Sequence, residues 1–376
     1  MITIETVNQD SKSEVNAFVQ FQYDLYRDVP QYTPPFINDV KLMLNRKKHP
    51  FYEHSDGQFY VAKMDGKIVG RLAILVNNPF NEYHKTKKAQ FCLFDCIDNQ
   101  EVANALFEKA FEWCRERGLT EVVGPKGLSS FDGYGILIEG YDQHQMMNMV
   151  SYNFPYYPKL LENLGFEKEV DFVSCYVHKD DFQMPEKVRE VATRVIERGK
   201  FKIHEFKSKR ELVKKYANKV GETYNKSFIN NWEYYPLSQS EMKLLVDNLM
   251  SVIDPRLIKI ITYDEEIVGF LIAFPDVSKA MKRHGGKLTL GCIIDLLIEL
   301  KRTKWVSLNG AGILPEYQGR GGNALLYYEM EKTIREYGFE HFELTQVAET
   351  AVQMRKDLIT AGGKPYKNHR VYHKKI

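Results

Sequence analysis

The stretch Ile313-Leu-Pro-Glu-Tyr-Gln-Gly-Arg-Gly-Gly-Asn-Ala-Leu-Leu326 decides how this chain is interpreted. The apolar run before it predicts a β-strand over 305–313, and the apolar spacing after it predicts a helix. Glycines at 319, 321 and 322 remove Cβ atoms where a ligand could approach the backbone. The first N–H groups of the helix have no partner within it, and with the helix dipole they suit an anion such as a diphosphate. A plain strand-to-helix turn, with glycines for geometry alone, stays open as the alternative.

Length and composition describe an ordinary globular protein of two or three domains. The chain has 376 residues, 44% of them hydrophobic and 27% charged, and its net charge is +2. This near balance argues against a dedicated nucleic-acid binder, whose domain would be strongly basic. We therefore expect no nucleic-acid partner.

The five cysteines, at 92, 96, 114, 175 and 292, show no metal-ligand spacing. We expect buried reduced thiols, without a metal site or a disulfide framework. The N-terminal MITIETVNQD lacks the basic head and apolar core of a signal peptide. The run 288–300 contains two acidic residues and is too short to span a bilayer. These features predict a cytoplasmic protein.

An internal repeat runs through the chain. IVGRL at 68–72 recurs as IVGFL at 267–271, and ANAL at 103–106 recurs as GNAL at 322–325. Several such matches in the same order predict two copies of one unit. We place the copies at 1–178 and 201–376, with a linker helix within 179–200. The second copy is extended between its IVG strand and its GNAL helix, and the first is extended after its matching helix.

Each copy has the same predicted order of elements, β-α-α-β-β-β-α-β-α-β. This order predicts an α/β fold of the α+β mixed-sheet type, with helices on both faces of each sheet. Short polar turns predict the hairpins 58–64 with 67–76 and 257–263 with 266–274. The expected helices lie near 13–27, 36–46, 101–117, 209–228, 240–250 and 322–337.

The glycine-rich turn and the element order resemble the GNAT superfamily of N-acetyltransferases. The superfamily's acetyl-CoA pyrophosphate motif has the core Arg/Gln-x-x-Gly-x-Gly/Ala, and Gln318, Gly321 and Asn323 stand at its defining positions. Asn323 departs from the expected Gly or Ala. The resemblance covers nearly the whole chain as two tandem units, and it implies acetyl-CoA or a longer acyl-CoA as co-substrate, with no metal. The implied binding residues are Ile313, Gln318, Gly319, Arg320, Gly321, Gly322, Asn323 and Ala324.

The first copy lacks this turn. Its matching segment, DNQEVAN at 98–104, has no glycine, and the charges of Asp98 and Glu101 would repel a diphosphate. We interpret the first copy as a degenerate unit that has lost CoA binding and could carry the acceptor pocket. Its glycine-rich insertion, 124–144, is either a pocket wall or an ordered surface loop, and Glu139 is the catalytic candidate within it.

The resemblance implies direct attack of a neutral amine on a thioester, helped by an oxyanion donor and a base. We expect the donor on the strand near 308–312. Leu161 and Leu358 stand where the superfamily commonly has its tyrosine acid. Tyr156 and Tyr157 are then the candidate acids, or else core aromatics under a helix.

Carboxylates for the base are scarce near that strand. The strand itself has none, so Glu343 and Glu349, on or just after the next strand, are the fallback candidates. Each is otherwise a surface carboxylate, because glutamate is mostly exposed.

The second insertion, within 278–304, combines an apolar helical stretch with basic flanks. Such a segment could contact an anionic membrane, cover a long acyl chain, or pack between the two units. In their order along the chain, the segments 124–127, 152–157, 231–232, 313–326 and 365–366 resemble a tandem GNAT group of bacteria. The apolar insertion and an aromatic pocket would also suit a similarity to GNAT-like bacterial ceramide synthases, which join an acyl chain to a lipid amine.

Three functions follow. The first is an acyl-CoA-dependent N-acyltransferase acting on a small primary amine. The second is a long-chain N-acyltransferase acting on a lipid amine, peripheral on the inner face of the membrane. The third is a CoA-binding module without catalysis.

Overall fold

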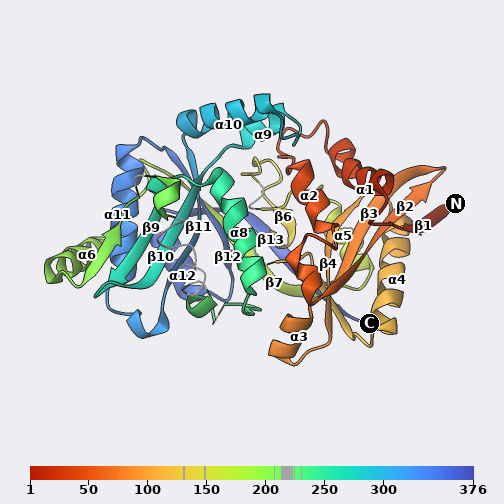
Figure 1. Cartoon of the computed structure of the whole chain (residues 1–376), viewed down its shortest axis with the longest axis horizontal. Coiled ribbons are helices and arrows are strands. Elements are labelled where there is room, and N and C mark those ends of the chain that lie inside the picture. The colour runs from red at the N-terminus through yellow and green to blue at the C-terminus, as the bar shows by residue number, and fades with distance from the viewer. Residues whose placement is uncertain (130–131, 148–149, 207, 213–222, 224, 230) are drawn as a thin grey trace. The chain divides into compact units, whose positions relative to one another are not determined.

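The computed structural model describes residues 1–376 apart from 130–131, 148–149, 207, 213–222, 224 and 230 (Figure 1). Contacts divide the chain into two compact units. Unit 1 comprises Met1–Val173, Val277–Glu299 and Tyr366–Ile376, and unit 2 comprises Ser174–Asp276 and Leu300–Pro365. The boundaries 1–178, 179–200 and 201–376 follow the repeat instead of contacts, so they stay a prediction.

The sheet of unit 1 has the strand order β1-β2-β3-β4-β5-β13, with β6 also paired to β13. Its pairs are antiparallel except for β4 with β5. The C-terminal strand β13 pairs with β5 through Tyr372 opposite Gly124 and His373 opposite Val123. The last strand of the predicted second copy therefore lies in the sheet of unit 1. The bounds are β1 Ile2–Thr6, β2 Asp56–Met64, β3 Lys67–Val76, β4 Lys88–Cys96, β5 Glu121–Gly124, β6 Ile136–Glu139 and β13 Lys364–Lys375.

Helices cover both faces of this sheet. Ile74 of β3 belongs to the core under α4 and α5, whereas its neighbours Ala73 and Leu75 belong to the core under α1 and α2. Successive strand residues point to opposite faces, which explains this division. The bounds are α1 Lys12–Leu25, α2 Ile37–Met43, a 3-10 helix Pro50–Glu53, α3 Asn78–His84, α4 Gln100–Glu116, α5 Tyr157–Asn163 and α9 Ser278–Arg283. Helix α10, Leu290–Arg302, begins in unit 1 and ends in unit 2.

Unit 2 contains the strand order β12-β11-β10-β9-β8, and its only parallel pair among the described strands is β11 with β12. One core lies between this sheet and helices α6 and α11. Strand β7, Glu167–His178, has residues in both units. The other bounds are α6 Glu186–Arg198, β8 Phe201–His204, α8 Gln239–Val252, β9 Ile258–Tyr263, β10 Glu266–Pro275, β11 Trp305–Ile313, α11 Gly322–Glu336, β12 His341–Ala348 and α12 Val352–Thr360, with 3-10 helices at Pro255–Leu257 and Pro315–Tyr317.

The fold class expected from the sequence is confirmed. Both hairpins form, and the linker helix appears as α6. The helix expected near 209–228 falls largely outside the described residues. All five cysteines are buried and free of disulfides, as expected, and burial raises the pKa of each thiol. Within the described part of the chain, no helix is both long and apolar enough to cross a membrane.

Candidate functional site

Strands β11 and β12 separate at the middle of unit 2. Their parallel register runs from Trp305 opposite His341 to Leu308 opposite Leu344. Strand β11 continues to Ile313 and β12 to Ala348, and no further register joins these parts. On the side of β11 that faces β12, the backbone N–H and C=O groups of residues 309–313 therefore have no strand partner. An extended ligand could form hydrogen bonds with them there.

A bulge falls at the same place. The register of β10 with β11 pairs Ile272 with Gly310 and Ala273 with Leu308, so Asn309 has no opposite residue. A β-bulge re-aims the backbone of the strand that contains it. We expected the oxyanion donor near 308–312, and the bulge makes a backbone N–H in this stretch the geometric candidate.

Two buried polar side-chain atoms accompany the bulge. Among the described residues, neither Asn309 Oδ1 nor Ser227 Oγ has a hydrogen-bond partner. Ser227 lies beside β11, because a Cβ added at Gly312 would be 3.4 Å from its Oγ. Buried polar atoms of a folded protein are nearly always bonded, so these two atoms beside unpaired backbone make this stretch a candidate for contacts with a ligand or with water. Neither residue was singled out by sequence, since an isolated Asn or Ser in a strand or helix carries no local signal.

The glycine-rich turn that follows β11 is held by its own backbone and by α6. Gln318 donates its side-chain amide to the Ile313 carbonyl at 3.0 Å, which closes the turn. Gly321 has φ 90°, and a Cβ there would lie 2.6 Å from Val195 Cγ2 of α6. A Cβ at Gly322 would lie 2.7 Å from Ile313 Cδ1. Only glycine fits both positions without rearrangement.

The turn leaves the N-terminus of α11 uncapped and positively charged. Gly321 is the N-cap residue and provides no side-chain acceptor. Helix geometry leaves the next N–H groups, including that of the exposed Asn323, without partners inside the helix. The Arg320 guanidinium is exposed and lies 5.2 Å from the ring centroid of Tyr317. Donors, dipole and guanidinium together suit a diphosphate.

The corresponding helix of unit 1 is closed to anions. Asn99 is the N-cap of α4, and its side-chain oxygen accepts hydrogen bonds from the N–H groups of Glu101 at 2.9 Å and Val102 at 3.2 Å. Asp98 and Glu101 add negative charge at the same helix end. The N–H groups that α11 leaves open are therefore already bonded in α4. An Asn directly before an amphipathic helix is a recognised N-cap signal, and it was overlooked in the sequence.

Tyr156 and Tyr157 are bonded within unit 1. The hydroxyl of Tyr156 donates to the Cys96 carbonyl at 2.7 Å. The hydroxyl of Tyr157, which is fully buried, accepts from the Cys96 N–H at 2.9 Å and lies 3.1 Å from the hydroxyl of Tyr26. Burial raises the pKa of both phenols well above the usual range. These contacts are those expected if Tyr156 and Tyr157 are core aromatics, the alternative to a role as catalytic acids.

The carboxylate candidates lie apart along the fold. Glu139 is exposed at the end of β6 in unit 1, opposite Asn368 of β13. Glu343 is fully buried on β12, opposite Ser307. Glu349 is half-buried and directly follows β12. Because parallel strands end at the same edge of a sheet, Glu349 and the glycine-rich turn lie at the same edge of unit 2.

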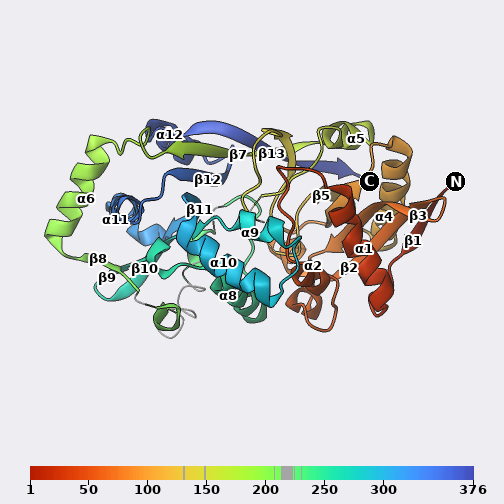
Figure 2. The same ribbon diagram turned by 90° about the horizontal axis from the view of Figure 1, so that it is seen from above.

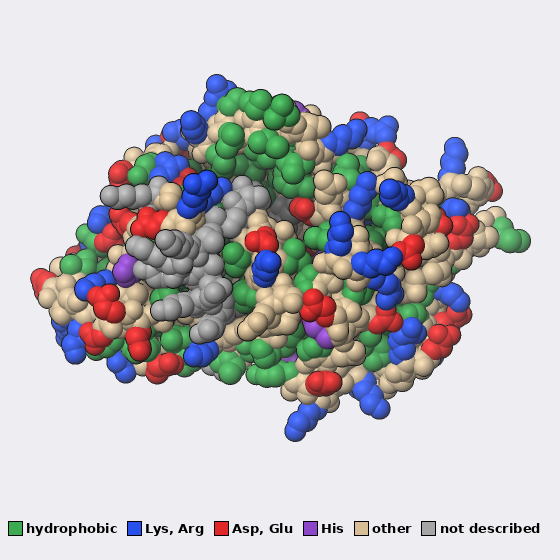
Figure 3. Space-filling model, in the orientation of Figure 1, with side chains coloured by type: hydrophobic (Ala, Val, Ile, Leu, Met, Phe, Trp, Pro, Cys, Tyr) green, Lys and Arg blue, Asp and Glu red, His purple; other side chains and the backbone are tan. Residues whose placement is uncertain are grey.

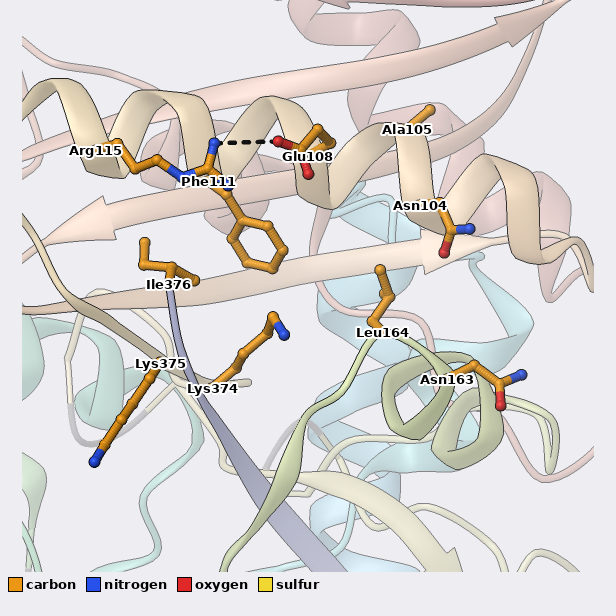
Figure 4. A pocket seen from close by; sticks show the side chains of 10 residues that line it. All are labelled: Asn104, Ala105, Glu108, Phe111, Arg115, Asn163, Leu164, Lys374, Lys375 and Ile376. Carbon is orange, nitrogen blue, oxygen red and sulfur yellow. Dashed lines mark hydrogen bonds and ion pairs between the residues drawn. The ribbon is translucent and has the colours of Figure 1, made fainter.

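The described part of unit 1 also has a shallow pocket of about 760 Å³ (Figure 4). It is lined by residues of α4, by Asn163 and Leu164, and by the C-terminal residues 374–376. Glu108 and Arg115 on its wall are bonded to each other at 3.1 Å. None of the candidate site residues lines it.

One group of side chains in unit 1 has the arrangement of a metal site. Glu121, Glu169 and His373 place one ligand atom each within 4.8 Å of one another. The ammonium of Lys88 lies 3.8 Å from Glu121 and 4.0 Å from Glu169. That ammonium supplies the positive charge that a metal ion would bring.

Comparisons with known proteins agree with this architecture, although no family model matches the sequence. The chain is 28% identical to protein YghO of Escherichia coli (strain K12), over 97% of this chain and 94% of the relative. It is 26% identical to the bacterial ceramide synthase of Caulobacter vibrioides (strain NA1000 / CB15N), over 97% and 95%. Among solved structures, a tandem GNAT protein from the clavulanic acid biosynthesis pathway superposes with TM-score 0.58 at 11% identity, covering 100% of this chain and 98% of that one. Over its whole length, the chain has the tandem fold of the GCN5-related N-acetyltransferases.

Proposed function

We propose that this protein is an acyl-CoA-dependent N-acyltransferase whose CoA site lies in unit 2. The observation that supports it most is the contrast between two helix ends. The α11 end is uncapped, rich in glycine and flanked by Arg320, whereas the α4 end is capped by Asn99 and acidic. Backbone amides of 319–323 would bind the diphosphate, with Ile313, Gln318 and Ala324 shaping the turn around them. The Gln318 N–H itself donates to the Pro315 carbonyl at 3.2 Å.

In the proposed reaction the nitrogen of a neutral primary amine attacks the thioester carbonyl. The new C–N bond forms as the C–S bond breaks, the amine loses a proton to a base, and the thiolate leaving group takes one up. The separated part of β11 would hold the acyl-pantetheine arm in an extended conformation. A backbone N–H at the Asn309 bulge would stabilise the negative charge that develops on the carbonyl oxygen.

For proton transfer we propose Glu349 as the first candidate, because it lies at the edge of the sheet where the turn lies. Tyr156, Tyr157 and Glu139 are the alternative candidates. Both tyrosine hydroxyls are already bonded at Cys96, and Glu139 is exposed on β6.

A second candidate function is long-chain acylation of a lipid amine. The Caulobacter relative is named as a ceramide synthase, and it matches this chain along nearly its whole length. A long acyl-CoA and a sphingoid-base amine are the substrates that this candidate requires.

The test combines calorimetric CoA binding with a thiol-release assay on the full chain. The acyl donors would be acetyl-CoA and palmitoyl-CoA, and the acceptors ethanolamine, a polyamine and a sphingoid base. Thiol release that depends on an amine supports the acyltransferase. Preference for acetyl-CoA with a small amine favours the first candidate function, and preference for palmitoyl-CoA with a sphingoid base favours the second. CoA binding without thiol release would leave a non-catalytic CoA-binding module. No binding of either thioester would overturn the proposal.

A further inference from the structure

Helix α10 presents its apolar face to solvent. Leu290, Ile294 and Leu297 have 75%, 53% and 57% of their surface exposed, and Ile293 and Ile298, at 43% and 39%, lie at the margins of the same face. This i, i+3, i+4, i+7, i+8 pattern is normally the buried stripe of a helix. Figure 3 shows apolar side chains gathered at the top of the view, over the α9–α10 region. We call Leu290, Ile293, Ile294, Leu297 and Ile298 the apolar stripe.

The opposite face of α10 is polar and faces the protein. Arg283 of α9 binds Asp295 through its Nε at 2.8 Å and binds Glu299 through its Nη2 at 2.8 Å. His284 Nε2 lies 3.2 Å from the same Asp295 carboxylate, and Cys292 on this face is fully buried. Turning the helix to bury the stripe would break these ion pairs and leave carboxylates against an apolar core. The ion pairs of Asp295 and Glu299 therefore keep the apolar stripe directed toward solvent.

Hydrogen bonds also hold the base of the α9–α10 hairpin, drawn in Figure 2, to other segments of unit 1. Ser278 Oγ accepts from the Met147 N–H at 2.6 Å, and Lys282 donates to the Pro30 carbonyl at 2.6 Å. The Gly286 carbonyl accepts from the Ile37 N–H at 3.0 Å, and a Cβ at Gly286 would collide with the Pro35 carbonyl. A hairpin held in this way presents the stripe on a rigid support.

Exposed cations flank the stripe at both ends. Lys279 and Lys287 precede it, and Lys301 and Arg302 form the last turn of α10. None of the four forms an ion pair with another residue that the structure describes. The acidic residues of the helix, Asp295 and Glu299, face away from the stripe. The stripe and its rim thus combine exposed apolar surface with uncompensated positive charge.

We propose that the apolar stripe docks this protein onto an anionic lipid bilayer, with the helix axis in the membrane plane. Apolar side chains would enter the boundary of the acyl region while the four cations meet acidic headgroups. A second copy of the chain fits less well, because two facing stripes would oppose eight cations. A convex helix face also offers no groove that could enclose a single acyl chain. The proposal is independent of acyl transfer, and it would hold even if the protein had no CoA site.

The test is vesicle flotation of the full chain with phosphatidylglycerol–phosphatidylcholine vesicles and with pure phosphatidylcholine vesicles. We expect binding to the anionic vesicles that weakens with salt. The variant Ile294→Gln/Leu297→Gln should lower the partition coefficient at least about tenfold. Lys301→Gln/Arg302→Gln should lower it by roughly fivefold for each charge and should reduce the salt dependence.

A matched control is available on α12. Val352 and Ile359 are 56% and 55% exposed, so Val352→Gln/Ile359→Gln replaces two apolar side chains of similar fractional exposure on another helix and should leave flotation unchanged. Thermal unfolding of every variant verifies the fold. Absence of flotation, or equal loss in the α12 control, would overturn the proposal. Self-association of the parent chain in sedimentation, lost in the stripe variant, would overturn it in favour of a second copy.

Discussion

A single charge placed at the second residue of α11 should separate helix stability from CoA binding. Asn323 is exposed, and it is the position where the sequence departs from the superfamily motif. Asn323→Glu adds a carboxylate beside the open N–H groups of the helix. Since a negative charge in the first turn interacts favourably with the helix dipole, the free energy of unfolding should rise by about 0.3–1 kcal/mol.

The same carboxylate should repel the diphosphate of CoA. Two unit charges about 6 Å apart interact by roughly 0.7 kcal/mol at the dielectric constant of water and by about 2.8 kcal/mol at an effective value near 20. A diphosphate carries two such charges, so CoA binding should weaken by at least about 1.4 kcal/mol. That loss is a rise of about tenfold or more in Kd.

The control for this variant is Asn323→Gln, which has the size of Glu without its charge. Calorimetry with CoA should give a large rise in Kd for Glu and a small change for Gln, and the difference should shrink in high salt. Thermal unfolding of both variants supplies the stability comparison. Equal effects of Glu and Gln on Kd would refute the electrostatic argument. An unchanged Kd in both variants would place CoA away from α11.

Three further outcomes are expected. Asn99→Ala removes the cap of α4 and should lower the free energy of unfolding by about 1 kcal/mol in urea, with the Kd for CoA unchanged; weaker CoA binding would reveal a site in unit 1. Tyr157→Phe removes the hydroxyl that bonds at Cys96 and should lower stability by about 1–3 kcal/mol in the same assay, while a large fall in kcat with intact stability would restore its catalytic role. Burial lowers the pKa of His369 to about 4, so the unfolded chain binds more protons than the folded one between pH 6.5 and 4. The contribution of His369 to the free energy of unfolding should therefore be fully present above pH 6.5, and the free energy should fall by about 3 kcal/mol as the pH drops to 4. Urea titrations at several pH values should show a smaller fall in His369→Gln. An equal fall in that variant would contradict the assignment.

Local patterns in the sequence predicted local structure well. IVGRL and IVGFL lie on β3 and β10, and ANAL and GNAL lie on α4 and α11. These motifs succeed because periodicity and turn residues act within a few positions of the chain. The glycine-rich turn was found for the same reason, since its glycines form a local pattern and Gly322 is required by its near neighbour Ile313. Gly321 is instead required by Val195 of α6, a contact that the local pattern does not reveal.

Features that depend on distant partners were not predictable. The sequence of β13 indicates a strand, but nothing local specifies that Tyr372 lies opposite Gly124 in unit 1. The apolar run of α10 predicts a helix, but its outward face is decided by Arg283, which lies on another helix. Asn309 became a candidate only when the register of β10 with β11 left it unpaired. In each case the deciding partner is far away in the chain or on another element.

The two helix ends also show how the two units differ in their capacity to bind an anion. An N-cap residue normally adopts extended geometry and closes the helix with its side chain, as Asn99 does at φ −150°. Gly321 instead adopts φ 90°, a conformation that suits glycine and leaves the N–H groups open. Open donors are tolerated only where water or an anion can satisfy them, and the exposure of residues 318–320 and 323 provides that access. In unit 1 the corresponding N–H groups are bonded to the Asn99 side chain, so the turn before α4 does not need glycines to expose them. The segment 98–104 accordingly contains no glycine. This contrast between the helix ends supports the proposed CoA site in unit 2, and under that proposal the N-terminus of α4 in unit 1 would not bind the diphosphate.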